Sequence, residues 1–121
     1  MALPNLKNPT YIYGKSARYA VTATLATALA APGTGKTFKI NSIFCSNNDT
    51  ANVGTAVDIS LSIYDGSADR YIAYTISVPA DATQIISSKE TYFYLEETDS
   101  LRAVASITSR LQLVIGYEEI S

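Results

Sequence analysis

The stretch VDISLSIYDGSADRYIAYTISV, residues 57–78, determines the fold that this sequence predicts. Residues 57–64 alternate between apolar and polar side chains, which is typical of a strand with one buried face. Residues 71–78 show the same alternation, and the segment DGSADR between them has the composition of a turn. The stretch therefore predicts an antiparallel β-hairpin with one apolar face.

Further strands are expected on both sides of this hairpin. A second hairpin is predicted over residues 101–117, and shorter strands over 36–46, 83–88 and 92–95. Residues 17–29 alternate as well, so they predict one long strand with a bulge or kink near Leu25. No segment requires a helix. Short strands joined by turns predict an all-β, antiparallel β-sandwich with a jelly-roll or related Greek-key topology, formed by residues 17–121 as a single domain.

The alternating side chains also predict the core of this sandwich. One face of each hairpin strand is apolar, so that face is expected to lie between the sheets. The predicted core residues are Ile59, Leu61 and Ile63; Ile72, Tyr74 and Ile76; Leu101, Ala103 and Ala105; and Leu111, Leu113 and Ile115.

Residues 1–16, MALPNLKNPTYIYGKS, differ in composition from the rest of the chain. Pro4 and Pro9 cannot donate ladder hydrogen bonds, and asparagine and glycine accompany them. The segment is therefore predicted to be an extended N-terminal arm with little regular structure. Its apolar side chains indicate contact with either its own domain or a neighbouring subunit. The candidate interface residues are Leu3, Leu6, Tyr11, Ile12 and Tyr13.

Composition excludes several classes of partner. The 121-residue chain has a formal net charge of -2 and a pI of about 4.9, so it lacks the basic surface of a nucleic-acid-binding protein. No apolar run is long enough for a membrane helix. Residues 15–31 are rich in alanine but carry three threonines, so we expect no targeting segment there. The one cysteine, Cys45, is expected to be a small buried side chain.

The segment APGTGKT, residues 31–37, resembles the end of a phosphate-binding loop. The full motif requires a glycine five residues before Gly35, and this chain has Ala30 there. A phosphate loop also leads from a strand into a helix, whereas the residues after Lys36 have the period of a strand. We therefore expect a turn between two strands and no bound nucleotide.

Few residues are available for catalysis. The chain has no histidine, which excludes Ser–His–Asp and Cys–His sites and a zinc site made of Cys and His. Acidic side chains gather at residues 96–99 and 118–119, where we expect solvated charges at turns and strand ends. The segment DGSAD, residues 65–69, offers oxygen ligands for calcium, but a hairpin turn is the preferred interpretation. The sequence predicts no enzyme, no catalytic residue, no metal site and no cofactor.

Several segments resemble a known group of proteins. They are SVPADATQIISS, YFYLEETDSLRAVAS and LQLVIGYEEI, with KINSIFCSNND in the first half of the chain. They are similar to small β-sandwich virion structural proteins of tailed bacteriophages, especially marine phages. The resemblance covers roughly residues 38 to 120. It implies a β-sandwich subunit of a phage particle and brings no catalytic residues.

The resemblance implies a protein that acts through contacts between subunits. We expect a capsid decoration or cement subunit, with shell or neck and tail proteins of the virion as partners and self-association into a homo-oligomer. Its expected location is the virion, after synthesis in the host cytoplasm. A neck or tail subunit is the alternative within this class. A carbohydrate-binding surface module is the alternative from another class, and it requires an exposed row of tyrosines or a calcium site at residues 65–69.

Overall fold

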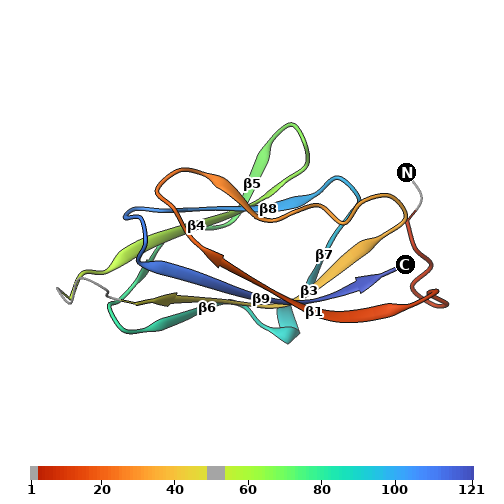
Figure 1. The fold of residues 1–121 in the computed structure, drawn as a ribbon, viewed down its shortest axis with the longest axis horizontal. Coiled ribbons are helices and arrows are strands. Elements are labelled where there is room, and N and C mark those ends of the chain that lie inside the picture. Colours follow the sequence, from red (N-terminus) through yellow and green to blue (C-terminus); the bar gives the residue numbers. More distant parts are fainter. Residues whose placement is uncertain (1–2, 49–53) are drawn as a thin grey trace.

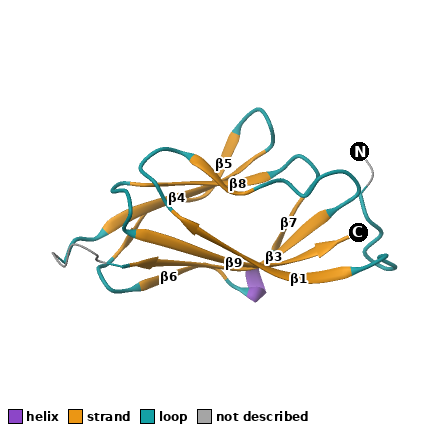
Figure 2. Ribbon diagram, in the orientation of Figure 1, coloured by secondary structure: helices purple, strands orange, loops and turns teal. Residues whose placement is uncertain are grey.

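Two antiparallel β-sheets pack face to face in the computed structural model, which describes residues 3–48 and 54–121 (Figure 1). The five-stranded sheet has the order β1-β9-β3-β6, with β7 also beside β3, and the four-stranded sheet has the order β2-β8-β4-β5. The strands are β1 (Ile12–Ala20), β2 (Ala26–Leu29), β3 (Thr37–Asn47), β4 (Val57–Tyr64), β5 (Asp69–Val78), β6 (Thr83–Ser87), β7 (Phe93–Leu95), β8 (Ser100–Ala105) and β9 (Leu111–Ile120), with a 3-10 turn, η1 (Lys89–Thr91), before β7 (Figure 2). In the described part of the chain, no helix is long and apolar enough to cross a membrane. The prediction of an all-β antiparallel sandwich is confirmed.

The order of the strands is that of a jelly roll. The strands β1 to β4 alternate between the two sheets, and β4 and β5 form a hairpin within the smaller sheet. The late strands β8 and β9 each enter between two early strands: β8 lies between β2 and β4, and β9 lies between β1 and β3. Such returning strands define Greek-key connections. Of the two predicted topologies, the jelly roll is therefore the one that is found.

The inner faces of the two sheets form one apolar core. The predicted core residues of β8 and β9 are all buried, and so are Ile59 and Leu61 of β4. Ile63 of β4 is half-buried and packs against this core. Strand β3 adds buried side chains that the prediction did not include, namely Phe38, Ile40 and Ile43, beside Cys45, whose burial was predicted. The alternation of the sequence thus identified eight of the nineteen buried hydrophobic residues in the described part of the chain.

The predicted core face of β5 is wrong. The side chains that are exposed instead of buried are Ile72, Tyr74 and Ile76, at 41%, 66% and 38% exposure. For Ile72 and Tyr74 the cause is a β-bulge at Thr75, which has a φ of 49° and donates its backbone N–H to Oγ of Ser60 at 2.9 Å. Ile76 lies on the other side of this bulge, opposite buried Ile59, and is partly exposed because β5 is the last strand in its sheet order. The register of β5 against β4 shifts on both sides of Leu61. Because an extra residue reverses the alternation beyond it, Ala73 enters the core in place of Tyr74.

Residues 17–29 do not form the single strand that was predicted. Strand β1 ends at Ala20, and β2 begins at Ala26 in the other sheet. At the crossing Val21 is fully buried, and the hydroxyl of Thr22 donates to the carbonyl of Thr24 at 2.9 Å. This side-chain bond gives the backbone an alternative to ladder pairing. The predicted kink near Leu25 is therefore a complete change of sheet.

The irregular arm is shorter than the predicted residues 1–16. Strand β1 begins at Ile12, and Tyr11 and Ser121 extend its ladder by exchanging two backbone hydrogen bonds of 3.1 Å. Residues 3–9 keep the predicted irregular structure, and the backbone bond from Asn8 to the carbonyl of Asn5, at 3.1 Å, lies within that segment. Residues 1–2 of the predicted arm lie outside the described residues. The sequence did not indicate the early start of β1 because its pairing partner, β9, lies at the other end of the chain.

Candidate binding surfaces

The glycine-rich turn before β3 binds a carboxylate of the chain itself. Gly33 and Gly35 have φ values of 95° and 75°, and the N–H of Gly35 donates to Oε1 of Glu97 at 2.9 Å. After Lys36 the chain enters β3 at Thr37 rather than a helix. An internal carboxylate thus occupies the position that a bound anion would take. The segment is a turn between two strands, as expected.

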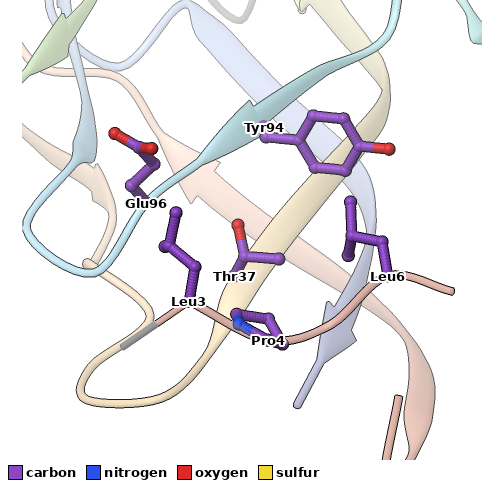
Figure 3. Close-up of a pocket in the computed structure, with 6 residues that line it drawn as sticks. All are labelled: Leu3, Pro4, Leu6, Thr37, Tyr94 and Glu96. Carbon is purple, nitrogen blue, oxygen red and sulfur yellow. The ribbon is translucent and has the colours of Figure 1, made fainter. Parts of the chain in front are cut away.

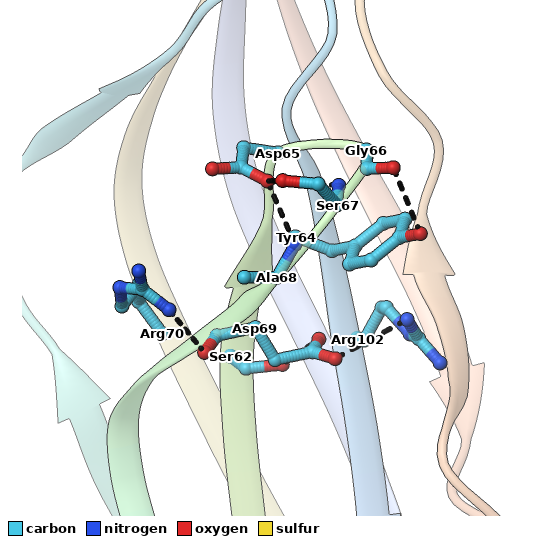
Figure 4. Close-up of polar contacts among 9 residues, drawn as sticks. All are labelled: Ser62, Tyr64, Asp65, Gly66, Ser67, Ala68, Asp69, Arg70 and Arg102. Atoms are coloured by element: carbon cyan, nitrogen blue, oxygen red, sulfur yellow. Dashed lines mark hydrogen bonds and ion pairs between the residues drawn. The ribbon is translucent and has the colours of Figure 1, made fainter.

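The turn at the tip of the β4–β5 hairpin is closed by its own side chains (Figure 4). Oδ1 of Asp65 accepts hydrogen bonds from the N–H and the hydroxyl of Ser67 and from the N–H of Ala68, at 2.9, 3.0 and 2.9 Å. The bonds from the backbone of Ala68 and Ser67 lower the pKa of the Asp65 carboxyl from 3.8 to about 2. The carboxylate therefore acts as a turn-closing acceptor.

The second carboxylate of the DGSAD segment also has a structural role. Asp69 accepts a hydrogen bond of 2.8 Å from the hydroxyl of Ser62, and its other oxygen lies 3.3 Å from the guanidinium of Arg102 (Figure 4). The guanidinium lies over the ring of Tyr64, 4.4 Å from the centroid. Among residues 3–48 and 54–121, no three His, Cys, Asp or Glu side chains gather as a metal site would require. The structure thus favours the predicted hairpin turn over the calcium alternative.

Two further acidic residues contact groups of the fold. Oδ2 of Asp99 accepts the N–H of Glu96 at 3.1 Å and closes the turn before β8. Glu119 is buried apart from 8% of its surface, and its carboxylate lies 3.2 Å from the ammonium of Lys15. Glycoside hydrolysis needs two carboxyl groups facing each other across a cleft. Neither of these carboxylates is arranged in that way, since each is engaged by the chain itself.

The single cysteine is a core residue, as predicted. Cys45 lies in β3, is fully buried and is paired with Leu113 of β9. Burial raises the pKa of its thiol from 9.0 to about 11. A thiol that is both buried and protonated at neutral pH is a poor nucleophile and a poor metal ligand.

The described part of the arm lies across β3 and β7 and leaves a groove beside it (Figure 3). The groove has a volume of about 220 Å³ and is lined by Leu3, Pro4 and Leu6 from the arm and by Thr37, Tyr94 and Glu96 from the sandwich. The side chains of Leu3 and Leu6 are 50% and 49% exposed. The arm therefore covers the sandwich here without burying its own apolar side chains.

The five predicted interface residues lie in two places. Leu3 and Leu6 line the arm groove, whereas Tyr11, Ile12 and Tyr13 lie together at the start of β1. The rings of Tyr11 and Tyr13 are in contact, with centroids 4.7 Å apart. All five side chains are exposed in the subunit. Their role as an interface stays a prediction.

A strip of exposed apolar side chains crosses the outer face of the larger sheet and continues around its edge. Phe44 of β3 lies opposite Val114 of β9 on one side and opposite Ile85 of β6 on the other. Ile85 also lines a groove of about 140 Å³ with Ile72 and Ile76 of β5. These five residues, Val114, Phe44, Ile85, Ile72 and Ile76, form the apolar strip, and each is between 38% and 56% exposed.

Our sequence reasoning missed this strip, although the sequence contains a signal for half of it. Ile43-Phe44 and Ile85-Ile86 are adjacent apolar pairs within strands. Successive side chains of a strand point to opposite faces. When one of each pair enters the core, the other must therefore face outward. Ile72 and Ile76 gave no such signal. Ile72 lies beyond the bulge at Thr75, and Ile76 is exposed because β5 is the last strand in its sheet order.

The exposed tyrosines form pairs rather than a flat row. Tyr71 and Tyr74 of β5 meet edge to face, with centroids 4.9 Å apart and an interplanar angle of 73°. Tyr92 and Tyr94 meet in the same way at 5.8 Å, and the ammonium of Lys39 lies 4.4 Å from the centroid of Tyr92. Edge-to-face contact is a favourable geometry for two rings. Neither pair presents the coplanar surface on which a sugar ring stacks.

Comparisons with known proteins show similarity in fold and no matching sequence family. No family model matches the sequence, and no curated protein matches it. A structure of Bacillus endospore appendages, a family of disulfide-linked pili, aligns with 92% of this chain and 87% of its own at 12% identity and a TM-score of 0.54. A pentameric capsid protein from metagenomic phage sequences aligns with 85% of this chain and 60% of its own at 16% identity and a TM-score of 0.41. The capsid of cyanophage Pam1 aligns with 99% of this chain and 91% of its own at 17% identity and a TM-score of 0.38.

The chain is therefore a β-sandwich similar in fold to the endospore appendage protein. At these identities the likeness to the appendage protein shows a shared fold and not a shared activity. The sequence resemblance to phage virion proteins has no matching family model, so it stays a prediction.

Proposed function

We propose that this chain is a non-enzymatic structural subunit of a bacteriophage virion, and specifically a capsid decoration or cement subunit. The observation that carries the proposal is the apolar strip. Monomeric proteins rarely expose contiguous apolar side chains over several strands unless the surface binds a partner. Fully burying a side chain such as Phe44 or Ile85 contributes roughly 1.5–3 kcal/mol. A strip of five such residues suits a protein whose function is to bind other subunits.

Two further observations support the same proposal. The sequence segments that resemble phage virion proteins include β3 and β9, which supply Phe44 and Val114. The candidate groups for chemistry, such as Glu97 and Asp69, are engaged in holding turns of the fold. The exposed side chains include several large apolar and aromatic ones, which are common at contact surfaces.

The number of copies of this chain per virion tests its proposed position on the particle. Mass spectrometry of virions purified from cells that make this chain during phage growth should detect it. A decoration subunit is expected in a fixed ratio to the major shell protein, whereas a neck or tail subunit is expected in a small number of copies per particle. A ratio of the second kind would replace the decoration role with the neck or tail alternative. Absence from the particle would overturn the proposal as a whole.

A pair of variants tests whether the apolar strip makes the contact. Phe44→Glu places a charge in the middle of the strip, and we expect it to abolish incorporation into particles. Thr83→Glu is the matched control, because Thr83 is exposed on the neighbouring strand β6 and lies outside the strip. Both variants should keep the melting temperature of the isolated subunit. Normal incorporation of Phe44→Glu would show that the strip is not the contact surface.

The carbohydrate-binding alternative receives less support from the geometry. It needs an exposed row of tyrosines or a calcium site. The structure has two edge-to-face tyrosine pairs, a third pair, Tyr11 and Tyr13, tilted by 34°, and a self-closed turn at residues 65–69. Titration with a glycan library, comparing the wild-type chain with Tyr74→Ala, separates the two classes. Saturable binding that this substitution removes would favour the carbohydrate module.

A further inference from the structure

The edges of the two sheets differ in how well they are protected against pairing with another strand. Strands β2 and β6 are four and five residues long, and each has a register shift against its neighbour. Strand β5 is longer but has two register shifts and the left-handed residue Thr75. Such short or bulged strands are the usual means of blocking edge-to-edge association. Strand β7 has only three residues.

Strand β1 lacks this protection. Its nine residues pair with β9 in continuous register from Ile12 opposite Ile120 to Ala20 opposite Gln112. In the sheet order β1 has β9 on one side, and no described strand lies on the other. It is therefore a long and regular open edge in the described structure. Lys15, which could guard such an edge with its charge, is instead paired with Glu119 at 3.2 Å.

The hydrogen bonds at the two ends of β1 show which of its residues bond to β9. Tyr11 exchanges backbone bonds with Ser121, and Val21 donates to the carbonyl of Leu111 at 2.9 Å. In an antiparallel pair, the backbone N–H and C=O groups of successive residues point alternately toward the partner strand and away from it. The odd-numbered residues of β1 therefore bond to β9, and the even-numbered ones direct their N–H and C=O groups outward. The outward-facing residues are Ile12, Gly14, Ser16, Arg18 and Ala20, and all five are exposed.

We propose that β1 pairs with β1 of a second copy of this chain, antiparallel and around a two-fold axis at Ser16. The pairing joins the two larger sheets into one continuous sheet across the dimer. An outward-facing residue must lie opposite another outward-facing residue, and a two-fold axis at Ser16 satisfies this for all five positions. Isologous contact of this kind is the commonest way in which identical subunits associate.

The side chains of β1 are compatible with this register. Tyr13 lies opposite Tyr19 of the second copy, which forms an aromatic cross-strand pair. Arg18 lies opposite Gly14, where nothing in the subunit lies within 4 Å of the position of a Cβ, so the arginine side chain has room. Ile12 lies opposite Ala20, and Lys15 lies opposite Ala17. No two like charges are directly opposed, and the exposed surfaces of Ile12 and Tyr13 become covered.

The contact between two copies of β1 is the surface through which the proposed virion subunit self-associates. The biological role of this contact rests on the proposed function, but the contact itself does not. Oligomeric state is measured on the purified chain, whereas the virion role is measured on particles. The two can therefore fail separately: a dimer that is absent from virions contradicts the proposed function alone, and a monomer found in virions contradicts the dimer alone.

Sedimentation equilibrium of the full chain tests the proposal. The wild-type chain is expected to be dimeric. Ser16→Pro removes an outward N–H from each copy without removing a bond to β9, so it should weaken dimerisation on the order of tenfold or more and leave the subunit folded. Ala17→Pro is the contrasting variant, because its N–H faces β9, so its loss should lower the melting temperature of the subunit itself, which Ser16→Pro should not. A wild-type chain that stays monomeric at the highest soluble concentration, or a Ser16→Pro dimer of unchanged affinity, would overturn the proposal.

A charge pair tests the register and does not depend on proline being tolerated. Ser16→Lys places two positive charges opposite each other at the two-fold axis, and Ser16→Glu places two negative charges there. Each variant alone is expected to be monomeric, and an equimolar mixture is expected to form a heterodimer. Thr83→Lys, exposed on the far edge of the same sheet, should remain dimeric. Homodimers of both Ser16 variants, or a mixture that stays monomeric, would show that Ser16 does not lie at the axis.

Discussion

Glu97 and Gly35 lie 62 residues apart in the sequence, and the backbone N–H of Gly35 donates to the Glu97 carboxylate at 2.9 Å. This bond joins the turn before β3 to the turn between β7 and β8. It also explains why a segment that resembles a phosphate loop is not one. The N–H of Gly35 does meet an anion, but the chain supplies it, and the N–H of Gly33 donates to the backbone carbonyl of Glu97 at 3.4 Å.

We expect that Mg-ATP and Mg-GTP do not stabilise the protein. The internal carboxylate repels a phosphate, and no helix follows Lys36 to complete a nucleotide site. Thermal-shift measurements on the wild-type chain and on Lys36→Ala should give the same melting temperature with and without nucleotide. A stabilisation of the wild type that disappears in Lys36→Ala would contradict this interpretation.

Truncation of the core should be costly, whereas truncation on β5 should not. Leu61→Ala and Leu113→Ala remove fully buried side chains, and each should lower the free energy of unfolding by about 2–5 kcal/mol. Ile72→Ala is the matched control, because Ile72 is 41% exposed and should lose about 1 kcal/mol or less. Urea denaturation measures all three. Equal losses at Ile72 and Leu61 would mean that the bulge at Thr75 does not turn Ile72 outward.

The Asp65 carboxylate should make the free energy of unfolding depend on pH in the acidic range. Its pKa in the folded protein, about 2, lies below the ordinary value of 3.8. The ionised form therefore stabilises the fold above about pH 4, and this contribution is lost as the pH falls toward 2. Asp65→Asn should be less stable than the wild type at neutral pH, and the difference should shrink in that window. An NMR titration of the Asp65 carboxyl with a midpoint near 4 would exclude the proposed cause.

The thiol of Cys45 should react only when the protein opens. Its pKa is raised to about 11 by burial, so both accessibility and thiolate content are low at neutral pH. Labelling with a disulfide reagent should be slow in buffer and fast in denaturant. Thr108→Cys adds an exposed thiol and should label at once as a positive control. Fast labelling of the native wild-type chain would place Cys45 at the surface.

Two deletions locate the boundary of the arm. Removal of residues 1–9 leaves the ladder of β1 complete and should change the melting temperature of the isolated subunit little. Removal of residues 1–14 also deletes the pairings of Ile12, Tyr13 and Gly14 with β9, and it should cost about 2 kcal/mol or more through lost backbone hydrogen bonds. Equal melting of the two truncated chains would mean that the early part of β1 contributes nothing to the fold.

Local patterns in the sequence predicted the sandwich and fewer than half of its buried hydrophobic residues. The alternation in β4, β8 and β9 identified buried Leu61, Leu101 and Leu113 correctly, because these strands keep one face inward over most of their length. The same reasoning failed in β5, where Thr75 inserts a bulge that depends on the hydroxyl of Ser60. Nothing in the residues around Thr75 indicates that bond.

The binding surfaces were less predictable, because they depend on contacts between distant segments. The apolar strip forms only when β3, β6 and β9 are neighbours and β5 is bulged. The open edge of β1 depends on pairing with β9, near residue 120. Only the apolar composition of the N-terminal segment predicts Tyr11, Ile12 and Tyr13 as interface residues. In the structure they lie at the start of the β1 edge.

The jelly-roll order has a consequence for how the protein is made. Strand β9 lies between β1 and β3 in the larger sheet, yet it comes after all the other strands in the sequence. During translation β1 and β3 leave the ribosome long before the strand that joins them. Until β9 emerges, β1 has no strand partner in the larger sheet, and β3 can pair there only with the short strands β6 and β7. The nascent chain must therefore stay open and free of aggregation until β9 has been synthesised.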